Sequence, residues 1–444
     1  MFRKTYLIMA VLVALSMIFA ACTSTDTGSE STEGQPAEVE NVTLRVLVHQ
    51  NPPMVAFMES FNQSFHEKYP NITVDMSIVN ANDLSTVTQT RLTANDVDVV
   101  DMFGFANAAQ PYMKQVDAPN WQQLIDAGLL MDLTGQPFVQ NYDSAAIQDA
   151  GTYNGKVYEI NLGRVSYSGI YYNKDMFTAN NVTVPTTWSE LVAACETFKA
   201  AGIPCMTAGG KDGWPIFVGA YGLLGAIYPD QAALAEGLWS GTIRWNDETS
   251  LVMWERMQVY ARDMIEEGAS GIAGDAAPGR FASGAVAMFP GGTWYAPAID
   301  AAEPAFEWGY IPFPGSDNPE DNQYLFGKYD QGWAVAANTP NADAAMLYLT
   351  EFSDPANYQA FVDAVGFIPT QPTATLNTTI GTEVAPYLAN FRVGYEQYWI
   401  APKGAGQFAN PWASYFMPFG TDDDPQTLAD KVQADLQSGL DAVK

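Results

Sequence analysis

The chain has 444 residues, of which 48% are hydrophobic and 13% aromatic, so it is long and apolar enough to form two domains. Fifty acidic against twenty basic side chains give a formal net charge of -30. That charge repels nucleic acid and anionic lipid surfaces, so binding to nucleic acid is excluded. Solubility outside the cell is the simplest explanation for the charge.

The amino terminus indicates export. Arg3 and Lys4 precede an apolar run, residues 6–21, that stops at Cys22. This is the charged start and short apolar core of a secretory signal, and the run is too short for a membrane span. The end "FAAC" resembles the lipobox of bacterial lipoproteins, although Phe19 stands where Leu is usual. We expect residues 1–22 to be a lipoprotein signal peptide with lipidation at Cys22; plain secretion with an incidental cysteine is the alternative.

The next segment, residues 23–40, is rich in Ser, Thr, Gly, Glu and Pro and has almost nothing to bury. We expect a disordered tether that reaches about 20 to 25 Å. No later segment is apolar enough to span a bilayer. The sequence therefore predicts a globular body outside the cytoplasm, anchored to the cell membrane by lipid, on its periplasmic or cell-surface side.

The globular body begins with an alternation of strands and helices. Residues 42–48 form a nearly continuous apolar run of the kind found in strands buried on both faces. A helical stripe over 54–65, a strand over 72–78, a helix over 84–92 and a strand over 97–103 follow. This order predicts right-handed crossovers and a mostly parallel α/β sheet.

A second α/β set begins near residues 168–177. Thr187 and Glu190 form a capping box, after which apolar residues recur at helical spacing until Gly202. We also expect a helix over 248–266, followed later by the stretch "GWAVAAN" (332–338). Two further helices complete the set, one carrying Ala345, Leu349 and Phe352 and one opened by Asp354 and Pro355.

Cys195 and Cys205 are the only cysteines beyond Cys22. Cys195 lies on the apolar face of the capped helix, and Cys205 lies in a short predicted strand, 203–206. In an exported protein a disulfide is one interpretation, and two packed thiols are the other. With only two histidines in the chain, no metal site is expected.

Five stretches in this order resemble the extracellular solute-binding proteins of ABC importers, in the large carbohydrate-binding group that includes maltose-binding protein. They are "GIYYNKDMF" followed by "VPTTWSELVAACETFKAAGIP", then "DGWPIFVGAYGLLG", "FASGAVAMFPGGTW", and "GWAVAAN" with "GFIPTQP". The resemblance extends over most of the chain from residue 42 onward.

The resemblance implies a two-lobed, type II periplasmic-binding-protein-like α/β fold with hinged lobes around a central cleft. By position, crossings between lobes are expected near 160–170, 326–334 and 366–372. Lobe one would comprise 41–165 plus 333–366, and lobe two 166–332 plus 367–444.

The same resemblance implies a binding protein and not an enzyme. It would be a monomer without a cofactor that captures a sugar or oligosaccharide by hinge closure and delivers it to membrane permease subunits. The chain has no phosphate-binding loop of its own, so the energy would come from a partner ATPase.

A sugar site needs flat apolar side chains interleaved with hydrogen-bonding groups. Trp214, Trp294 and Trp412 stand in stretches that match cleft loops of the family, and core packing is their alternative role. At a predicted crossing, "FGKYDQGW" supplies Tyr329, Asp330 and Trp333. Asp330 would accept hydrogen bonds from hydroxyls, or else bond to hinge backbone.

The remaining site candidates lie nearer the amino terminus. Ligands of open α/β sheets bind beyond the carboxyl ends of strands, and polar or aromatic residues follow two predicted strands there. Turn chemistry alone would also place Asn at such positions. These candidates are Gln50, Asn51, Phe103, Phe105 and Asn107, together with Arg164 and Tyr167 at the first crossing.

The strongest rival class is an exported glycosidase, which would also line a cleft with aromatic rings and carboxylates. No segment resembles a glycosidase motif, although fifty acidic residues leave a catalytic pair open. A serine hydrolase is disfavoured, because no G-x-S-x-G motif occurs and both histidines lie near the amino terminus. Within the binding class, a polyol or another polar non-sugar solute is the alternative ligand.

Overall fold

The computed structural model describes residues 40–103, 109–408 and 410–444. Residues Asn41–Lys444 form one compact unit. The signal peptide, Cys22 and nearly all of the predicted tether lie outside the described residues, as do Phe105 and Asn107. Within the described ranges, no helix combines the length and apolar character needed to cross a membrane.

A five-stranded sheet with the order β2-β1-β3-β12-β6 contains the first predicted strands. β1 runs parallel to both β2 and β3, as predicted for these first strands, whereas β12 runs antiparallel to β3 and β6, so the prediction of a mostly parallel sheet is wrong. The sheet is mixed because β12 comes from far along the chain. The strands are β1 (Val42–His49), β2 (Ile72–Val79), β3 (Val99–Phe103), β6 (Ile160–Asn161) and β12 (Gln331–Val335).

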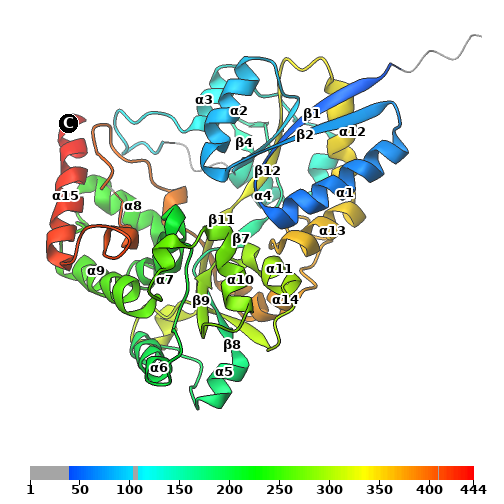
Figure 1. Ribbon diagram of the computed structural model, residues 1–444. Helices are drawn as coiled ribbons and strands as arrows, with labels where there is room; N and C mark the ends of the chain where they lie inside the picture. Colours follow the sequence, from blue (N-terminus) through cyan, green and yellow to red (C-terminus); the bar gives the residue numbers. More distant parts are fainter. Residues whose placement is uncertain (1–39, 104–108, 409) are drawn as a thin grey trace, which may run out of the picture. The chain divides into compact units, whose positions relative to one another are not determined.

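Helix α1 (Pro52–Lys68) begins immediately after β1 and fixes the position of the loop between them. The Asn51 side chain accepts a hydrogen bond from the Met54 N–H at 3.4 Å, and two prolines occupy the first turn, where a missing N–H costs nothing. As predicted, one stripe is buried. It packs near α12 (Ala342–Phe352) and α13 (Pro355–Val365) (Figure 1).

Two three-stranded sheets, with the orders β10-β8-β9 and β13-β11-β7, and a small two-stranded β4-β5 sheet form the other sheets of the described residues. The β10-β8-β9 sheet is wholly antiparallel, and helices α10 (Ala277–Ala282), α11 (Ala296–Ala301) and α14 (Thr379–Val384) lie near it (Figure 1). The strands are β7 (Arg164–Ser166), β8 (Gly169–Asn173), β9 (Met288–Gly291), β10 (Trp308–Pro312), β11 (Leu325–Tyr329) and β13 (Phe391–Val393).

Helix α7 (Trp214–Ile227) is buried over most of its length, and its first turn begins directly after Gly213. The predicted 248–266 helix ends as an α-helix at Val259, and a π-helical turn over Tyr260–Met264 completes it. The remaining helices and short strands are α2 (Leu84–Thr93), α3 (Asn120–Asp126), α4 (Ser144–Ala150), α5 (Lys174–Ala179), α6 (Trp188–Ala200), α8 (Gln231–Ser240), α9 (Glu248–Val259), α10 (Ala277–Ala282), α11 (Ala296–Ala301), α14 (Thr379–Val384), α15 (Pro425–Ala442), β4 (Thr152–Tyr153) and β5 (Lys156–Val157).

Three chain segments that link the sheets are hydrogen-bonded to one another. The Leu162 N–H donates to the Gln331 carbonyl at 2.6 Å, and the Asp330 N–H donates to the Gly163 carbonyl at 3.0 Å. Arg164 and Ile368 exchange backbone hydrogen bonds of 2.8 Å in both directions. The chain therefore passes between the five-stranded sheet and the β13-β11-β7 sheet through adjacent, mutually supported strands.

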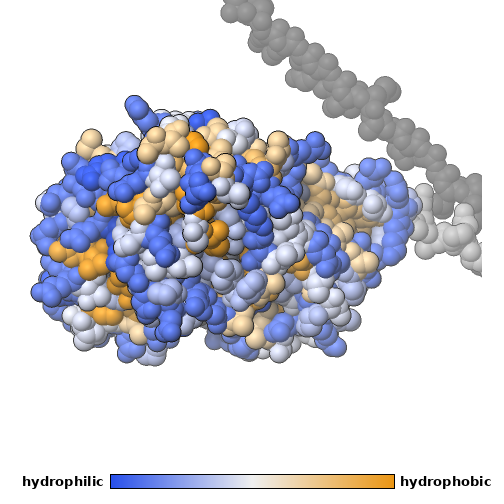
Figure 2. All heavy atoms as spheres, turned by 90° about the horizontal axis from the view of Figure 1, so that it is seen from below, coloured by the Kyte–Doolittle hydropathy of each residue, from blue (hydrophilic) through white to orange (hydrophobic). Residues whose placement is uncertain are grey.

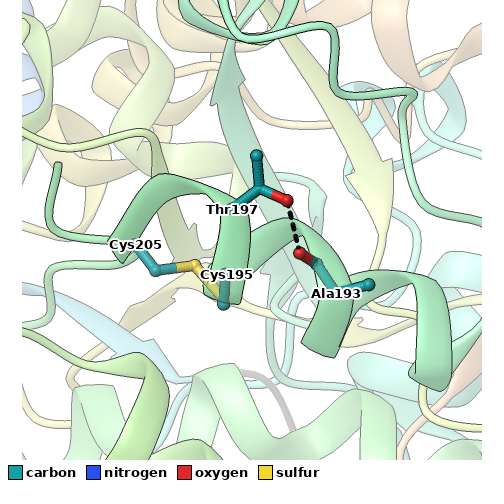
Figure 3. Close-up of a disulfide and its surroundings, with 4 residues drawn as sticks. All are labelled: Ala193, Cys195, Thr197 and Cys205. Atoms are coloured by element: carbon teal, nitrogen blue, oxygen red, sulfur yellow. Dashed lines mark hydrogen bonds between the residues drawn. A yellow bond between two sulfur atoms is a disulfide. The ribbon is translucent and has the colours of Figure 1, made fainter. Parts of the chain in front are cut away.

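Cys195 and Cys205 form a disulfide that links α6 to the segment that follows it (Figure 3). Of the two interpretations left open by the sequence, the structure contains the disulfide. The predicted 203–206 strand is reduced to a single bridging residue, Met206, which pairs with both Ile265 and Met288.

The predicted capping box at the start of α6 is present. The Thr187 hydroxyl oxygen accepts a hydrogen bond from the Glu190 N–H at 3.3 Å, and the Glu190 carboxylate accepts one from the Thr187 N–H at 3.2 Å. We expect Thr187→Ala to lower the free energy of unfolding by about 1 kcal/mol, as measured by urea denaturation, because the Glu190 N–H loses its acceptor while the other half of the box remains.

The control for this cap is Thr197→Ala on the same helix. The Thr197 hydroxyl only donates to the Ala193 carbonyl one turn back (Figure 3), and alanine is the better helix former. This control should be neutral or slightly stabilising. Equal losses in the two variants would contradict the capping role of Thr187.

On the face shown in Figure 2, hydrophilic residues predominate and hydrophobic residues form small separate groups. This agrees with the acidic composition and with a body exposed to water.

Candidate functional site

A cavity of about 310 Å³ is lined by residues from the carboxyl ends of β1 and β3, the β11–β12 junction, the start of α7 and the loop after β9. Its volume is at the lower end of the range usual for small-molecule sites. The carboxyl end of β1 is where the sequence predicted ligand contacts. Eight predicted site residues line it: Gln50, Asn51, Phe103, Tyr167, Trp214, Trp294, Asp330 and Trp412.

Trp333 does not line the cavity, which corrects the prediction from the sequence. It is 0% exposed and lies inside β12, where its ring contacts Phe352 and Tyr348 of α12 at centroid distances of 5.7 and 6.4 Å. Asp330, just before β12 begins, does line the cavity. Trp333 therefore belongs to the core between the sheet and α12.

Arg164 and Tyr329 are also absent from the cavity lining. They are paired on neighbouring strands β7 and β11. Because side chains alternate along a strand, Lys328 and Asp330 face the cavity while Tyr329 points the other way. The Arg164 guanidinium instead lies 5.0 Å from the centre of the Phe391 ring.

The first group of cavity aromatics is the Trp214 platform, defined by Trp214, Trp294 and Tyr295. The Trp214 ring lies 6.2 Å from that of Trp294 and 6.4 Å from that of Tyr295, the latter nearly parallel at 10°. A Cβ at Gly292 would come within 1.8 Å of the Trp294 indole, so only glycine permits this ring position. The Gly-Gly turn is thus needed to place Trp294.

The second group is the Trp412 platform, in which Phe217 and Trp412 stack at a centroid distance of 5.1 Å and an angle of 18°. Phe217 comes from the first turn of α7 and Trp412 from a loop near the carboxyl end of the chain. Both residues line the same cavity as the Trp214 platform. The cavity therefore offers flat apolar surfaces from several distant chain segments.

Charged groups accompany these rings. The Lys328 ammonium lies 2.9 Å from an Asp330 carboxylate oxygen and 4.7 Å from the centre of the Phe103 ring. Burial lowers the pKa of Lys328, but Asp330 and Glu396 outweigh burial and hold it above its ordinary value. Burial raises the pKa of the Glu396 carboxyl, against the attraction of Lys328.

His49, at the end of β1, lines the cavity and is held there by the side chains of Asp101 and Gln331. Its Nδ1 lies 2.5 Å from an Asp101 carboxylate oxygen, and the Gln331 side-chain nitrogen lies 2.7 Å from the same ring nitrogen. Burial lowers the pKa of His49, but Asp101 more than compensates, so the pKa is raised. Burial raises the pKa of the adjacent Glu159 well above its usual value, with Asp101 and Asp330 adding to the effect.

Several residues that line the cavity were not predicted from the sequence: His49, Phe217, Asp275, Tyr295, Lys328 and Glu396. Lys328 could have been found, because strand alternation places it on the same side as Asp330. No local pattern marks Glu396 or Asp275. Within the described ranges, no cluster of His, Cys, Asp and Glu suited to a metal ion occurs.

A carbohydrate-like ligand suits this arrangement chemically. The rings can cover the C–H faces of a sugar, and carboxylates, amides and hydroxyls between them can accept or donate hydrogen bonds at its rim.

The comparison with known families agrees with the fold and the cavity. The model of the bacterial extracellular solute-binding protein family matches residues 50–359, and the chain belongs to this family. Its members are non-enzymatic solute-binding components of ABC importers. The resemblance inferred from the five sequence motifs is thereby confirmed.

Two curated relatives and two solved structures illustrate the likeness. The multiple sugar-binding protein of Streptococcus mutans is 27% identical over 79% of each chain, and an ABC transporter extracellular-binding protein of Pyrococcus horikoshii is 26% identical over 69% of this chain and 70% of its own. The binding protein RafE in complex with raffinose has a TM-score of 0.71 at 21% identity, covering 91% of this chain and 100% of its own. A Bacillus licheniformis sugar transporter with stachyose has a TM-score of 0.68 at 16% identity, covering 90% and 100%. These structures confirm the type II binding-protein fold.

Proposed function

We propose that this protein captures a sugar or oligosaccharide in the cavity and delivers it to the permease subunits of an ABC importer. The observation that carries the proposal is a single cavity containing the Trp214 and Trp412 platforms interleaved with Asp330, Glu396 and Tyr167. The name of the Streptococcus mutans relative and the sugars in the RafE and Bacillus licheniformis structures support it.

In the proposed mechanism, lobe one (41–165 plus 333–366) and lobe two (166–332 plus 367–444) close about the strands that join them. Ligand contacts from both lobes would favour the closed state, because a ligand shifts such an equilibrium only by its preference for one state. The hydrogen-bonded segments around Gly163, Asp330 and Ile368 would serve as the hinge. The permease would then recognise the closed form.

The proposal includes attachment to the membrane. A diacylated Cys22 and the tether 23–40 would hold the body on the extracytoplasmic side, where released solute is close to the permease. A lipid-labelling experiment with a Cys22→Ser variant tests this part: loss of label with the variant supports it, and an unlabelled wild-type protein contradicts it.

The decisive test of the ligand class is calorimetric titration with mono- and oligosaccharides, polyols and other polar solutes, alongside an assay for new reducing ends. We expect saturable binding of at least one sugar without turnover. Tight binding of a non-sugar, with no sugar bound, would overturn the carbohydrate assignment. Release of reducing ends would establish the glycosidase alternative instead.

A further inference from the structure

Acidic groups outnumber basic ones in the cavity wall. Asp275, Asp330 and Glu396 all line it, whereas Lys328 is the one lysine or arginine among the described lining residues. Lys328 is already bonded to Asp330 at 2.9 Å. His49, the other basic group, is bonded to the buried Asp101 at 2.5 Å. Once these two pairs are set aside, Glu396 and Asp275 lack a cation of their own.

The surroundings of the two carboxyls explain why this imbalance matters. Burial raises the pKa of Asp275, the neighbouring Asp212 raises it further, and only His49 opposes them. Lys328 attracts the Glu396 carboxylate but is also paired with Asp330. Burial outweighs this attraction and raises the pKa of Glu396. Asp275 is exposed at the rim of the cavity, whereas Glu396 is half-buried. The half-buried carboxylate is the costlier of the two to keep charged without a cation, and a bound cation would reduce that cost.

The Tyr167 hydroxyl is an independent indication that a donor belongs here. Tyr167 is 3% exposed and lines the cavity, and its hydroxyl lies near Glu396 and Tyr221 without making a well-oriented hydrogen bond within the described residues. The Tyr295 hydroxyl, buried at the cavity wall near Trp294, likewise makes none of good geometry there. Buried hydroxyls are normally paired, so both oxygens are available to accept hydrogen bonds from a ligand.

The aromatic rings would also attract a cation. The indoles of Trp214, Trp294 and Trp412 line the cavity, and indole faces bind ammonium groups better than other side-chain rings do. The overall charge of -30 raises the local concentration of cations and lowers that of anions. The acidic lining and the indole rings therefore both favour a ligand that carries a positive charge, and the tyrosine hydroxyls can accept hydrogen bonds from it.

We propose that the preferred ligand is an oligosaccharide of amino sugars whose protonated amines lie near Glu396 and near Asp275, and that sugars bearing carboxylates are rejected. This inference rests on the proposed function, since it specifies which carbohydrate the same cavity takes. The ammonium group would supply the missing positive charge, while the sugar ring would stack on the platforms.

The test compares matched oligosaccharides of equal length and linkage built from glucosamine, N-acetylglucosamine, glucose and glucuronate, and the corresponding galacto series, by calorimetry at neutral pH. We expect the best free-amine sugar to bind at least tenfold more tightly than its acetylated and hydroxyl counterparts, and the uronate to bind most weakly. This preference should pass through a maximum as the pH is lowered from neutral, because protonation of the sugar amine strengthens the attraction first and protonation of the carboxyls with raised pKa then weakens it.

Two variants and a control locate the effect. Glu396→Gln and Asp275→Asn should each reduce the ratio of amine to neutral affinity, whereas Glu255→Gln, the same chemical change on the exposed surface of α9, should leave the ratio unchanged. Should a cavity variant fail to fold, the wild-type pH profile still decides. Neutral sugars binding as tightly as free-amine sugars would overturn this inference alone, and failure of every sugar to bind would overturn the proposed function as well.

Discussion

Trp294→Ala is expected to weaken sugar binding at least tenfold, which corresponds to about 1.4 kcal/mol. The indole lines the cavity beside Trp214, and its position depends on the absence of a side chain at Gly292. Truncation would remove one of the two indoles of the Trp214 platform and leave the C–H face of the sugar that it covers in water. Titration calorimetry of variant and wild type measures the effect.

The control for Trp294→Ala is Trp188→Ala, which removes a buried tryptophan at the start of α6, outside the cavity lining. It should lower stability and leave affinity unchanged. Trp294 also packs against hydrophobic residues on several sides, so some loss of stability is expected there too. A lower melting temperature with unchanged affinity would assign Trp294 to the core instead.

Trp333→Ala is expected to lower the free energy of unfolding by about 3 to 5 kcal/mol, because it removes a fully buried tryptophan from the core between β12 and α12. Urea denaturation measures this loss. Trp412→Ala is the matched comparison, because Trp412 stacks on Phe217 at the cavity wall. It should lose affinity with a smaller loss of stability. The reverse pattern in the two variants would contradict the assignments made here.

The architecture near the amino terminus was predictable from periodicity. The buried stripe of α1 and the apolar run of β1 are local patterns, and a strand–helix–strand order restricts the sheet to parallel crossovers. The antiparallel position of β12 was not predictable in this way, because its partner β3 lies more than two hundred residues earlier. Pairing over such a separation depends on packing that no local window contains.

The site was predictable where a motif marks a loop, and unpredictable where packing assembles it. Trp294 follows a recognisable Gly-Gly turn, and Asp330 lies at a crossing. Asp330 lies at the cavity wall, and Trp333, three positions later, lies in the core inside β12. Assigning only Asp330 to the site would have required knowing where β12 begins. Glu396 lies at the cavity because distant segments converge on it, and its own sequence neighbourhood gives no indication of this.

Carbohydrate binding in this cavity, with contacts from both of its sides, is tested most directly by hydrogen–deuterium exchange with and without a saturating, calorimetrically verified sugar. We expect protection at the start of α1, around Trp214, around Trp294 and around Trp412 together, because these segments line one cavity. Binding accompanied by protection elsewhere, with these segments unchanged, would contradict it.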